Sequence, residues 1–172
     1  MKIIINENQY ELLKEMKDKP LVYNFPSLDV FGYERPMDNW NLMQKFLVKK
    51  GNPDYTVDGD LDLRNTSIKS LGNLTSVGGE LDLEDTTIES LGKLTSVDGS
   101  LSLSYTPIKS LGNLILVDGS LYLTHSSIES LGNLTTVGGN LYLEDTPISE
   151  KYTEEEIRSQ VKVEGKIYLW KL

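Results

Sequence analysis

The residues of this chain that could do chemistry are few, and they are not grouped as a catalytic site requires. His125 is the only histidine and cysteine is absent, so the sequence assembles neither a thiolate metal site nor a catalytic triad. Aspartate–glycine pairs recur, but each offers one carboxylate where calcium takes about six oxygens. No glycine-rich phrase is followed by the Lys and Ser/Thr of a phosphate-binding loop. The sequence therefore predicts a protein that is not an enzyme and holds no metal or cofactor.

A second chemical pattern concerns binding. Acidic residues flank the leucines of two short segments, 60–64 and 80–84, and tyrosines take equivalent positions in later segments. Carboxylates suit a basic partner, and tyrosine suits an interface because it combines a large apolar area with a polar tip. Whether these side chains share one surface depends on the elements that carry them.

Those elements come from a 20-residue repeat that runs from Val57 to Asp145. The phrase VDGDLDLRNTSIKSLGNLTS is followed by three close copies and by the partial copy VGGNLYLEDTPIS. Self-similarity at a short fixed period is the signature of a solenoid. The spacing of Leu61 and Leu63 predicts a strand with both leucines inward, and the later spacings of three suit an extended or 3₁₀-like return path. Stacked coils would bury the leucines in one core and pair successive strands in parallel.

The run Leu61-x-Leu63-x-x-Thr66-x-Ile68 resembles the leucine-rich repeat pattern L-x-L-x-x-N-x-L, of the short bacterial type. The phrase V-x-G-x-L-x-L is also similar to the L domains of receptors. The resemblance implies an α/β-type repeat solenoid, with a right-handed coil, a parallel sheet of about six strands and a strand face that binds proteins. It implies no chemistry.

Hydroxyl residues stand where that family has asparagine. In the family the asparagine ladder bonds backbone groups between coils, and a hydroxyl can do the same with a shorter reach. We therefore expect these residues to form a buried ladder rather than nucleophiles, since no base accompanies them. The residues are Thr66, Thr86, Thr106, Ser126 and Thr146.

Helical caps are expected at both ends, because the terminal coils would otherwise expose leucines and an unpaired strand edge. The expected divisions are a cap at 1–56, the solenoid at 57–148, and a C-terminal cap helix with a final strand at 149–172.

In the N-terminal cap we expect a strand at 2–5, a helix at 8–17 and an irregular, aromatic-rich segment up to Pro36. A second helix, capped by Asp38 or Asn39, should reach Lys49. Trp40 and Phe46 are the expected contacts with the first coil. The alternative is that the aromatic-rich segment of this cap binds a partner.

In the C-terminal cap, Thr153 and Glu156 form a capping-box pattern that predicts a helix ending near Gln160. The phrase V-x-G-x-L-x-L then returns from Val163, so we expect a sixth strand with Trp170 on its outer face.

Alternation along the strands should send the residues between the leucines to one outer wall. The first two coils place five acids and one arginine there, the third places serines, and the last three place tyrosines. Stacked like charges cost stability, whereas the separate column at 69, 89, 109 and 129 alternates Lys and Glu. The expected partner-binding residues are Asp60, Asp62, Glu80, Asp82, Glu84, Tyr122, Tyr142, Tyr168 and Trp170. The opposing interpretation is that strand propensity selected the tyrosines and solubility the acids.

The net charge of −9 over 172 residues argues against nucleic acid or an anionic membrane as the partner and favours a basic protein. The N-terminus lacks the apolar region of a signal peptide and no stretch is long enough to span a bilayer, so we expect a cytoplasmic protein.

The leading hypothesis is a non-enzymatic module that docks a basic protein and can inhibit it by competition. An origin in a phage or bacterium, for example as an antagonist of a host defence protein, is fold-level analogy only. The alternative is a solenoid that binds a glycan, a small molecule or a nucleotide on its aromatic ladder. The oligomeric state is left open.

Overall fold

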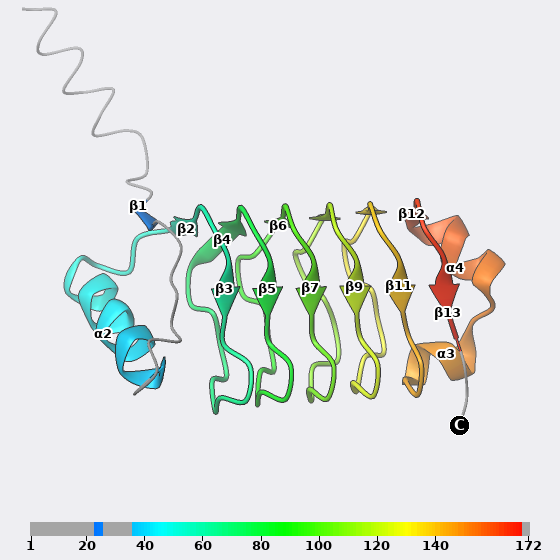
Figure 1. Cartoon of the computed structure of the whole chain (residues 1–172), viewed down its shortest axis with the longest axis horizontal. Helices are drawn as coiled ribbons and strands as arrows, with labels where there is room; N and C mark the ends of the chain where they lie inside the picture. Colours follow the sequence, from blue (N-terminus) through cyan, green and yellow to red (C-terminus); the bar gives the residue numbers. More distant parts are fainter. Residues whose placement is uncertain (1–22, 26–35, 170–172) are drawn as a thin grey trace, which may run out of the picture.

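The computed structural model describes residues 23–25 and 36–169, which fold as a parallel β-solenoid with two sheets (Figure 1). One sheet has six strands, in the order β13 (Ile167–Tyr168), β11 (Leu141–Tyr142), β9 (Leu121–Tyr122), β7 (Leu101–Ser102), β5 (Leu81–Asp82), β3 (Leu61–Asp62). The other has seven, in the order β1 (Tyr23–Phe25), β2 (Tyr55–Val57), β4 (Leu74–Val77), β6 (Ser96–Val97), β8 (Leu116–Val117), β10 (Thr136–Val137), β12 (Lys162–Val163). The predicted repeat solenoid with a parallel sheet of six strands is confirmed.

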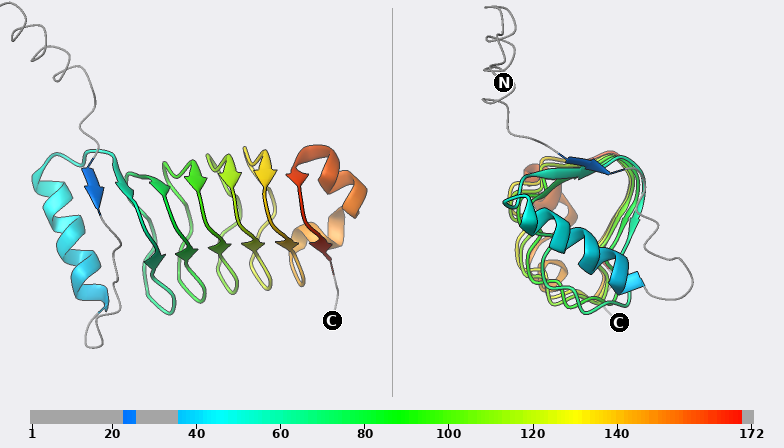
Figure 2. Two further views of the ribbon diagram at one scale, coloured as in Figure 1. Left: turned by 45° about the horizontal axis from the view of Figure 1, so that its top comes forward. Right: turned by 90° about the vertical axis from the view of Figure 1, so that its left-hand side faces the viewer.

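The seven-stranded sheet lies on the return path of each coil. The sequence left an extended and a 3₁₀-like return path open, and the path is extended. Its short strands pair with those of the neighbouring coils. Val77, for example, pairs with Val97, and Val97 with Val117. Each coil therefore contributes to both sheets, and almost every strand lies beside its own equivalent from the next coil (Figure 2, left).

The core is a continuous column of leucine, isoleucine and valine side chains between the sheets. Leu61 and Leu63 are fully buried, as predicted, and so are their equivalents up to Leu141 and Leu143; in the last coil, Ile167 is 9 % exposed and Leu169 is partly buried. Burying one such side chain stabilises a fold by about 1.5–3 kcal/mol, so repetition over the coils builds the main stabilising term. A single coil has no second layer against which to bury these residues, which is why the coils are stable only as a stack.

The hydroxyl column is buried, but its bonding differs from the expectation. Thr66 Oγ1 donates to the carbonyl of Leu63 at 2.6 Å, and Thr106 Oγ1 donates to that of Leu103 at 2.6 Å. These bonds close a turn inside one coil, so the expected bonding between coils is wrong. Thr86 and Thr146 likewise donate to the carbonyl three residues earlier, so the threonine hydroxyls of this column are used within their own coils. Ser126, 2 % exposed, is the exception, because its hydroxyl has no hydrogen-bond partner in the described chain.

Glycine is required at the corner before the strands of the six-stranded sheet that follow β3. A Cβ atom at Gly99 would lie 2.6 Å from the backbone of Gly79, and one at Gly119 would lie 2.6 Å from the amide nitrogen of Ser100. Real Cβ atoms do not approach other atoms so closely, so any side chain here would push two coils apart.

The N-terminal cap consists of α2 (Pro36–Lys49) and strand β1. Helix α2 lies across the first end of the coil stack (Figure 2, right). Trp40, Met43 and Leu47 are buried and belong to the core. Phe46 is 40 % exposed, with the Lys50 ammonium 5.7 Å from its ring centre, so its choice as a cap contact was wrong.

Two boundaries in this cap also differ from the expectation. Helix α2 begins at Pro36, two residues before the expected cap at Asp38, because proline is well suited to the first turn of a helix. The segment expected to be irregular includes strand β1, which pairs in parallel with β2. The expected strand at 2–5 and helix at 8–17 lie outside the described residues.

The C-terminal cap contains two short helices, α3 (Pro147–Lys151) and α4 (Glu154–Gln160). Thr153 accepts from the amide of Glu156, and the carboxylate of Glu156 accepts from the amide of Thr153, so the predicted capping box is confirmed. Helix α3 was not predicted; Thr146 begins it with the same motif. The predicted sixth strand is confirmed as β13, which pairs with β11.

The hydroxyl column gives a stability prediction. Thr106→Val should lower the free energy of unfolding by about 1–2 kcal/mol, because the Leu103 carbonyl loses its donor. Ser126→Ala should leave it nearly unchanged, since that hydroxyl makes no bond to lose. Urea unfolding followed by circular dichroism measures both, and equal losses in the two variants would contradict the account of the column.

Tyr55 gives a prediction about pH. Its hydroxyl donates to the Leu71 carbonyl at 2.6 Å and accepts from Gln44 at 3.1 Å, and burial raises its pKa above the ordinary value of 10.0. The unfolded chain therefore loses this proton at lower pH than the folded chain, so stability should fall as the pH rises above 10.0. Tyr55→Phe should make that fall shallower, while costing about 1–2 kcal/mol at neutral pH. Urea titrations at neutral and alkaline pH test both effects; an unchanged slope would contradict the assignment.

Candidate functional site

One column of side chains runs straight along the outer wall of the six-stranded sheet. Register pairs each member with its equivalent on the next strand, so the prediction that they share one wall is confirmed for the described residues. The column consists of Asp62, Asp82, Ser102, Tyr122, Tyr142 and Tyr168. Trp170, expected at the end of this wall, lies outside the described residues.

Arg64 relieves the charge repulsion in the acidic part of the column. Its Nε donates to Asp62 Oδ2 at 2.8 Å, and its Nη1 lies 3.6 Å from Asp82 Oδ2. The hydrogen bond with Asp62, followed by the charges of Asp62 and Asp82, raises the pKa of Arg64. The stacked acids that the sequence presents as costly are thus partly neutralised within the chain.

Some of the predicted binding acids also hold the backbone. Asp62 and Asp82 accept from the amides of Arg64 and Glu84, at 3.1 and 3.0 Å. Asp60 accepts from the amide of Glu80 in the next coil at 2.8 Å. Equivalent side chains continue this ladder, where Ser100, Ser120 and Asn140 accept from the amides of Ser120, Asn140 and Lys166. Sequence reasoning missed the ladder, although its signal is a short oxygen-bearing residue after the corner glycine, as at Asp60, Ser100, Ser120 and Asn140; Glu80 interrupts it.

Glu80 and Glu84 differ from the other acids. Neither carboxylate makes a hydrogen bond or salt bridge with a residue in the described part of the chain. Glu80 is exposed and Glu84 is half-buried. These two side chains are therefore the acids of the wall that can meet an external cation without breaking an internal bond.

The three tyrosines form a stack. The ring centres of Tyr122 and Tyr142 lie 4.7 Å apart with an interplanar angle of 7°, and those of Tyr142 and Tyr168 lie 4.6 Å apart with an angle of 1°. Asn140 donates an amide hydrogen to the Tyr142 hydroxyl at 3.1 Å. Because rings this close cannot lie side by side in one plane, they must overlap face to face. The stack therefore offers ring edges and hydroxyl groups to a partner, and the faces between the rings are covered.

The serine coil lies between the acids and the tyrosines. Ser102 is 9 % exposed and Ser104 is 8 % exposed, and neither hydroxyl has a hydrogen-bond partner among the described residues. The sequence presented them as a plain serine patch. Their burial depends on the larger side chains of the neighbouring coils, which no local pattern reveals.

A neighbouring column has left-handed backbone at every coil. It consists of Asn65, Asp85, Tyr105, His125 and Asp145, with φ between 52° and 58°. The Tyr105 ring stacks on His125 at 4.8 Å, and His125 Nδ1 lies 3.4 Å from Asp145 Oδ2. A bulky residue such as Tyr105 is uncommon in this conformation. No group of three or more potential metal ligands occurs in the residues that the structure describes.

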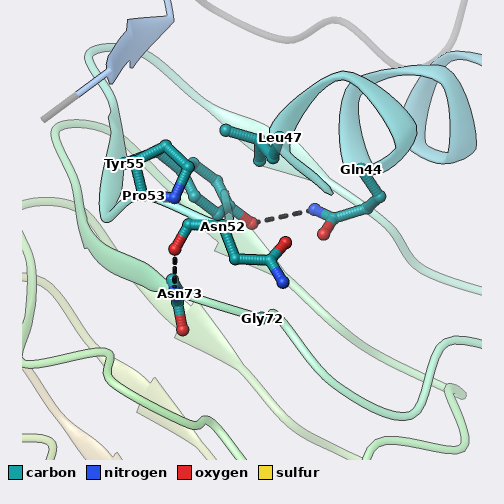
Figure 3. A pocket seen from close by; sticks show the side chains of 7 residues that line it. All are labelled: Gln44, Leu47, Asn52, Pro53, Tyr55, Gly72 and Asn73. Carbon is teal, nitrogen blue, oxygen red and sulfur yellow. Dashed lines mark hydrogen bonds between the residues drawn. The ribbon is translucent and has the colours of Figure 1, made fainter. Parts of the chain in front are cut away.

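A small open pocket of about 190 Å³ lies where helix α2 meets the first coil (Figure 3). The Tyr55 hydroxyl bonds to Gln44 and Leu71, and the Asn73 side-chain amide donates to the Asn52 carbonyl at 2.5 Å. These bonds join the cap to the solenoid, so we interpret the pocket as part of that joint.

Comparison with protein-family models, curated proteins and solved structures finds no significant match for this chain. Within the described residues no helix is both long and apolar enough to cross a membrane.

The tyrosine stack gives a prediction about stability. Tyr142→Ser should lower the free energy of unfolding by about 1–3 kcal/mol, because it removes two aromatic contacts worth about 0.5–1.5 kcal/mol each. Tyr142→Phe keeps both contacts and should cost less than about 1 kcal/mol. Urea unfolding compares the two variants, and equal costs would mean that the stacking contributes nothing.

Proposed function

We propose that this protein is a non-enzymatic binding module that docks a partner protein with a basic surface. The docking surface is the outer wall of the six-stranded sheet, with Glu80 and Glu84 at the acidic end and the tyrosine stack at the other. The carrying observation is the register of the sheet, which brings charged and aromatic side chains from successive coils onto one wall. The net charge of −9 favours a basic partner over an acidic one.

The shape of the stack supports a protein partner over a flat ligand. A platform for several sugar rings or nucleobases needs several open ring faces, and in this stack the faces between the tyrosines are covered by one another, which leaves the outer face of Tyr122. Ring edges and hydroxyl groups suit a protein surface, where tyrosine supplies both apolar area and hydrogen bonds. A glycan- or nucleotide-binding platform is therefore the weaker candidate.

Inhibition follows as a second part of the proposal. A module that covers a basic surface competes with whatever anionic molecule that surface otherwise binds. The origin of the protein in a phage or bacterium, and a role against host defence, remain analogy with other small repeat proteins.

The experiment is capture of partners from a lysate of the source organism by three immobilised proteins. Glu80→Lys/Glu84→Lys should recover the partner at least about tenfold less well than wild type, because charge reversal at an interface costs more than one kcal/mol. Glu89→Lys/Glu129→Lys makes the same change of charge away from the wall and should recover it as wild type does. Capture should also weaken as salt rises.

Equal recovery by wild type and Glu80→Lys/Glu84→Lys would remove this wall as the docking surface. Capture that is insensitive to salt but lost in Tyr142→Ser would favour the aromatic alternative.

A further inference from the structure

The strip formed by Ser102 and Ser104 is the part of the wall where two little-exposed hydroxyl residues make no side-chain hydrogen bond with the described residues. Both residues are more than nine-tenths buried, and neither hydroxyl has a hydrogen-bond partner in the described residues. Leu101 and Leu103 point into the core, so alternation directs both serines outward. Among the described residues, the buried side-chain oxygen that lacks a partner is that of Ser126, so the Ser102 and Ser104 oxygens still reach solvent and can accept from a ligand that carries hydrogen-bond donors.

The two strands that flank this strip present different side chains to it. On one side, β5 places Asp82 beside Ser102 and is followed by Glu84, whose carboxylate makes no hydrogen bond or salt bridge in the described chain, although its charge also contributes to the raised pKa of Arg64. On the other side, β9 places Tyr122 beside Ser102. Tyr142 covers one face of the Tyr122 ring, and no other described aromatic ring stacks against it. Serine is too small to cover the opposite face.

These three features together fit a guanidinium group. It is planar and stacks on an aromatic face, it carries five N–H donors and no acceptor, and it pairs with carboxylates. The three strands span about 10 Å. Within that width lie a ring face, two hydroxyl acceptors and the Glu84 carboxylate, which is not hydrogen-bonded in the described chain. Arg64 already demonstrates the carboxylate part, since its guanidinium bonds Asp62 and lies near Asp82 on the same wall.

We propose that the serine strip binds an arginine side chain of the partner protein, stacked on Tyr122 and hydrogen-bonded to Ser102, Ser104 and Glu84. This inference rests on the proposed function and names the chemistry that the wall recognises. Lysine fits less well, because its ammonium is a compact, strongly hydrated charge that lacks a plane to stack.

The test uses the full-length protein and three blocked tripeptides, acetyl-Gly-X-Gly-amide, in which X is arginine, lysine or citrulline. Nuclear magnetic resonance titration should show saturable shifts at Ser102, Ser104 and the Tyr122 ring with the arginine peptide, with a dissociation constant in the millimolar range expected for one side chain. The lysine peptide should bind at least about threefold more weakly. Citrulline, which keeps the shape without the charge, should give no saturable shift.

Matched variants locate the site. Glu84→Gln and Tyr122→Leu should each weaken the arginine peptide at least about threefold, whereas Glu129→Gln, which removes the same charge elsewhere, should have no effect. Equal binding of the arginine and lysine peptides, shifts centred away from the strip, or unchanged affinity in both variants would overturn the inference.

The outcome separates this inference from the proposed function. If Glu80→Lys/Glu84→Lys abolishes partner capture while Tyr122→Leu and Ser102→Ala leave it intact, the wall docks a partner without an arginine in the strip. If the arginine peptide binds the strip but capture does not depend on the wall, the strip is a guanidinium site and the proposed docking surface is wrong.

Discussion

The buried column of leucine, isoleucine and valine is the constraint on which the rest of the structure depends. Each coil supplies the same inward side chains, and Leu61, Leu63 and their equivalents up to Leu143 are fully buried. A coil cannot exclude water from these residues alone, so the coils must stack, and stacking fixes the register of both sheets. Once the register is fixed, the side chains between the leucines must lie on the outer face of the six-stranded sheet. The arrangement of the outer wall, which we propose as a binding surface, therefore follows from the packing of the core.

Some residues of the wall that we propose for binding also stabilise the fold. Asp60 and Asp62 are chemically suited to a cation, yet both accept backbone amide hydrogens, and Asp62 is paired with Arg64. Glu80 and Glu84 make no such bonds in the described chain. An acidic patch counted from the sequence thus overstates the charge available to a partner, and the hydrogen-bonding pattern reduces it to fewer side chains.

The fold was predictable because the alternation of Leu61 and Leu63 recurs with a fixed period. The seven-stranded sheet was not, since strands as short as Ser96–Val97 are too brief to display alternation. The prediction for Phe46 was wrong because this residue lies at the edge of the apolar stripe of α2. Successive helical residues are about 100° apart, so a residue at the edge of the stripe can be either buried or exposed. The tyrosine ladder followed from spacing alone. The low exposure of Ser102 and Ser104 was not predictable in this way, because it depends on the sizes of side chains in neighbouring coils.

The pairing of each strand with its own equivalent 20 residues away has a consequence for folding. Since the inward residues are nearly identical from coil to coil, a nascent chain can align a coil with the wrong neighbour at little cost in core packing. Such slipped stacks are kinetic traps, and only the features that differ between coils distinguish them from the native order. The contact of Arg64 with Asp82, the run of aromatic rings and the two terminal helical segments supply that difference. The side chains on the outer wall therefore help to specify which coils pair with one another during folding.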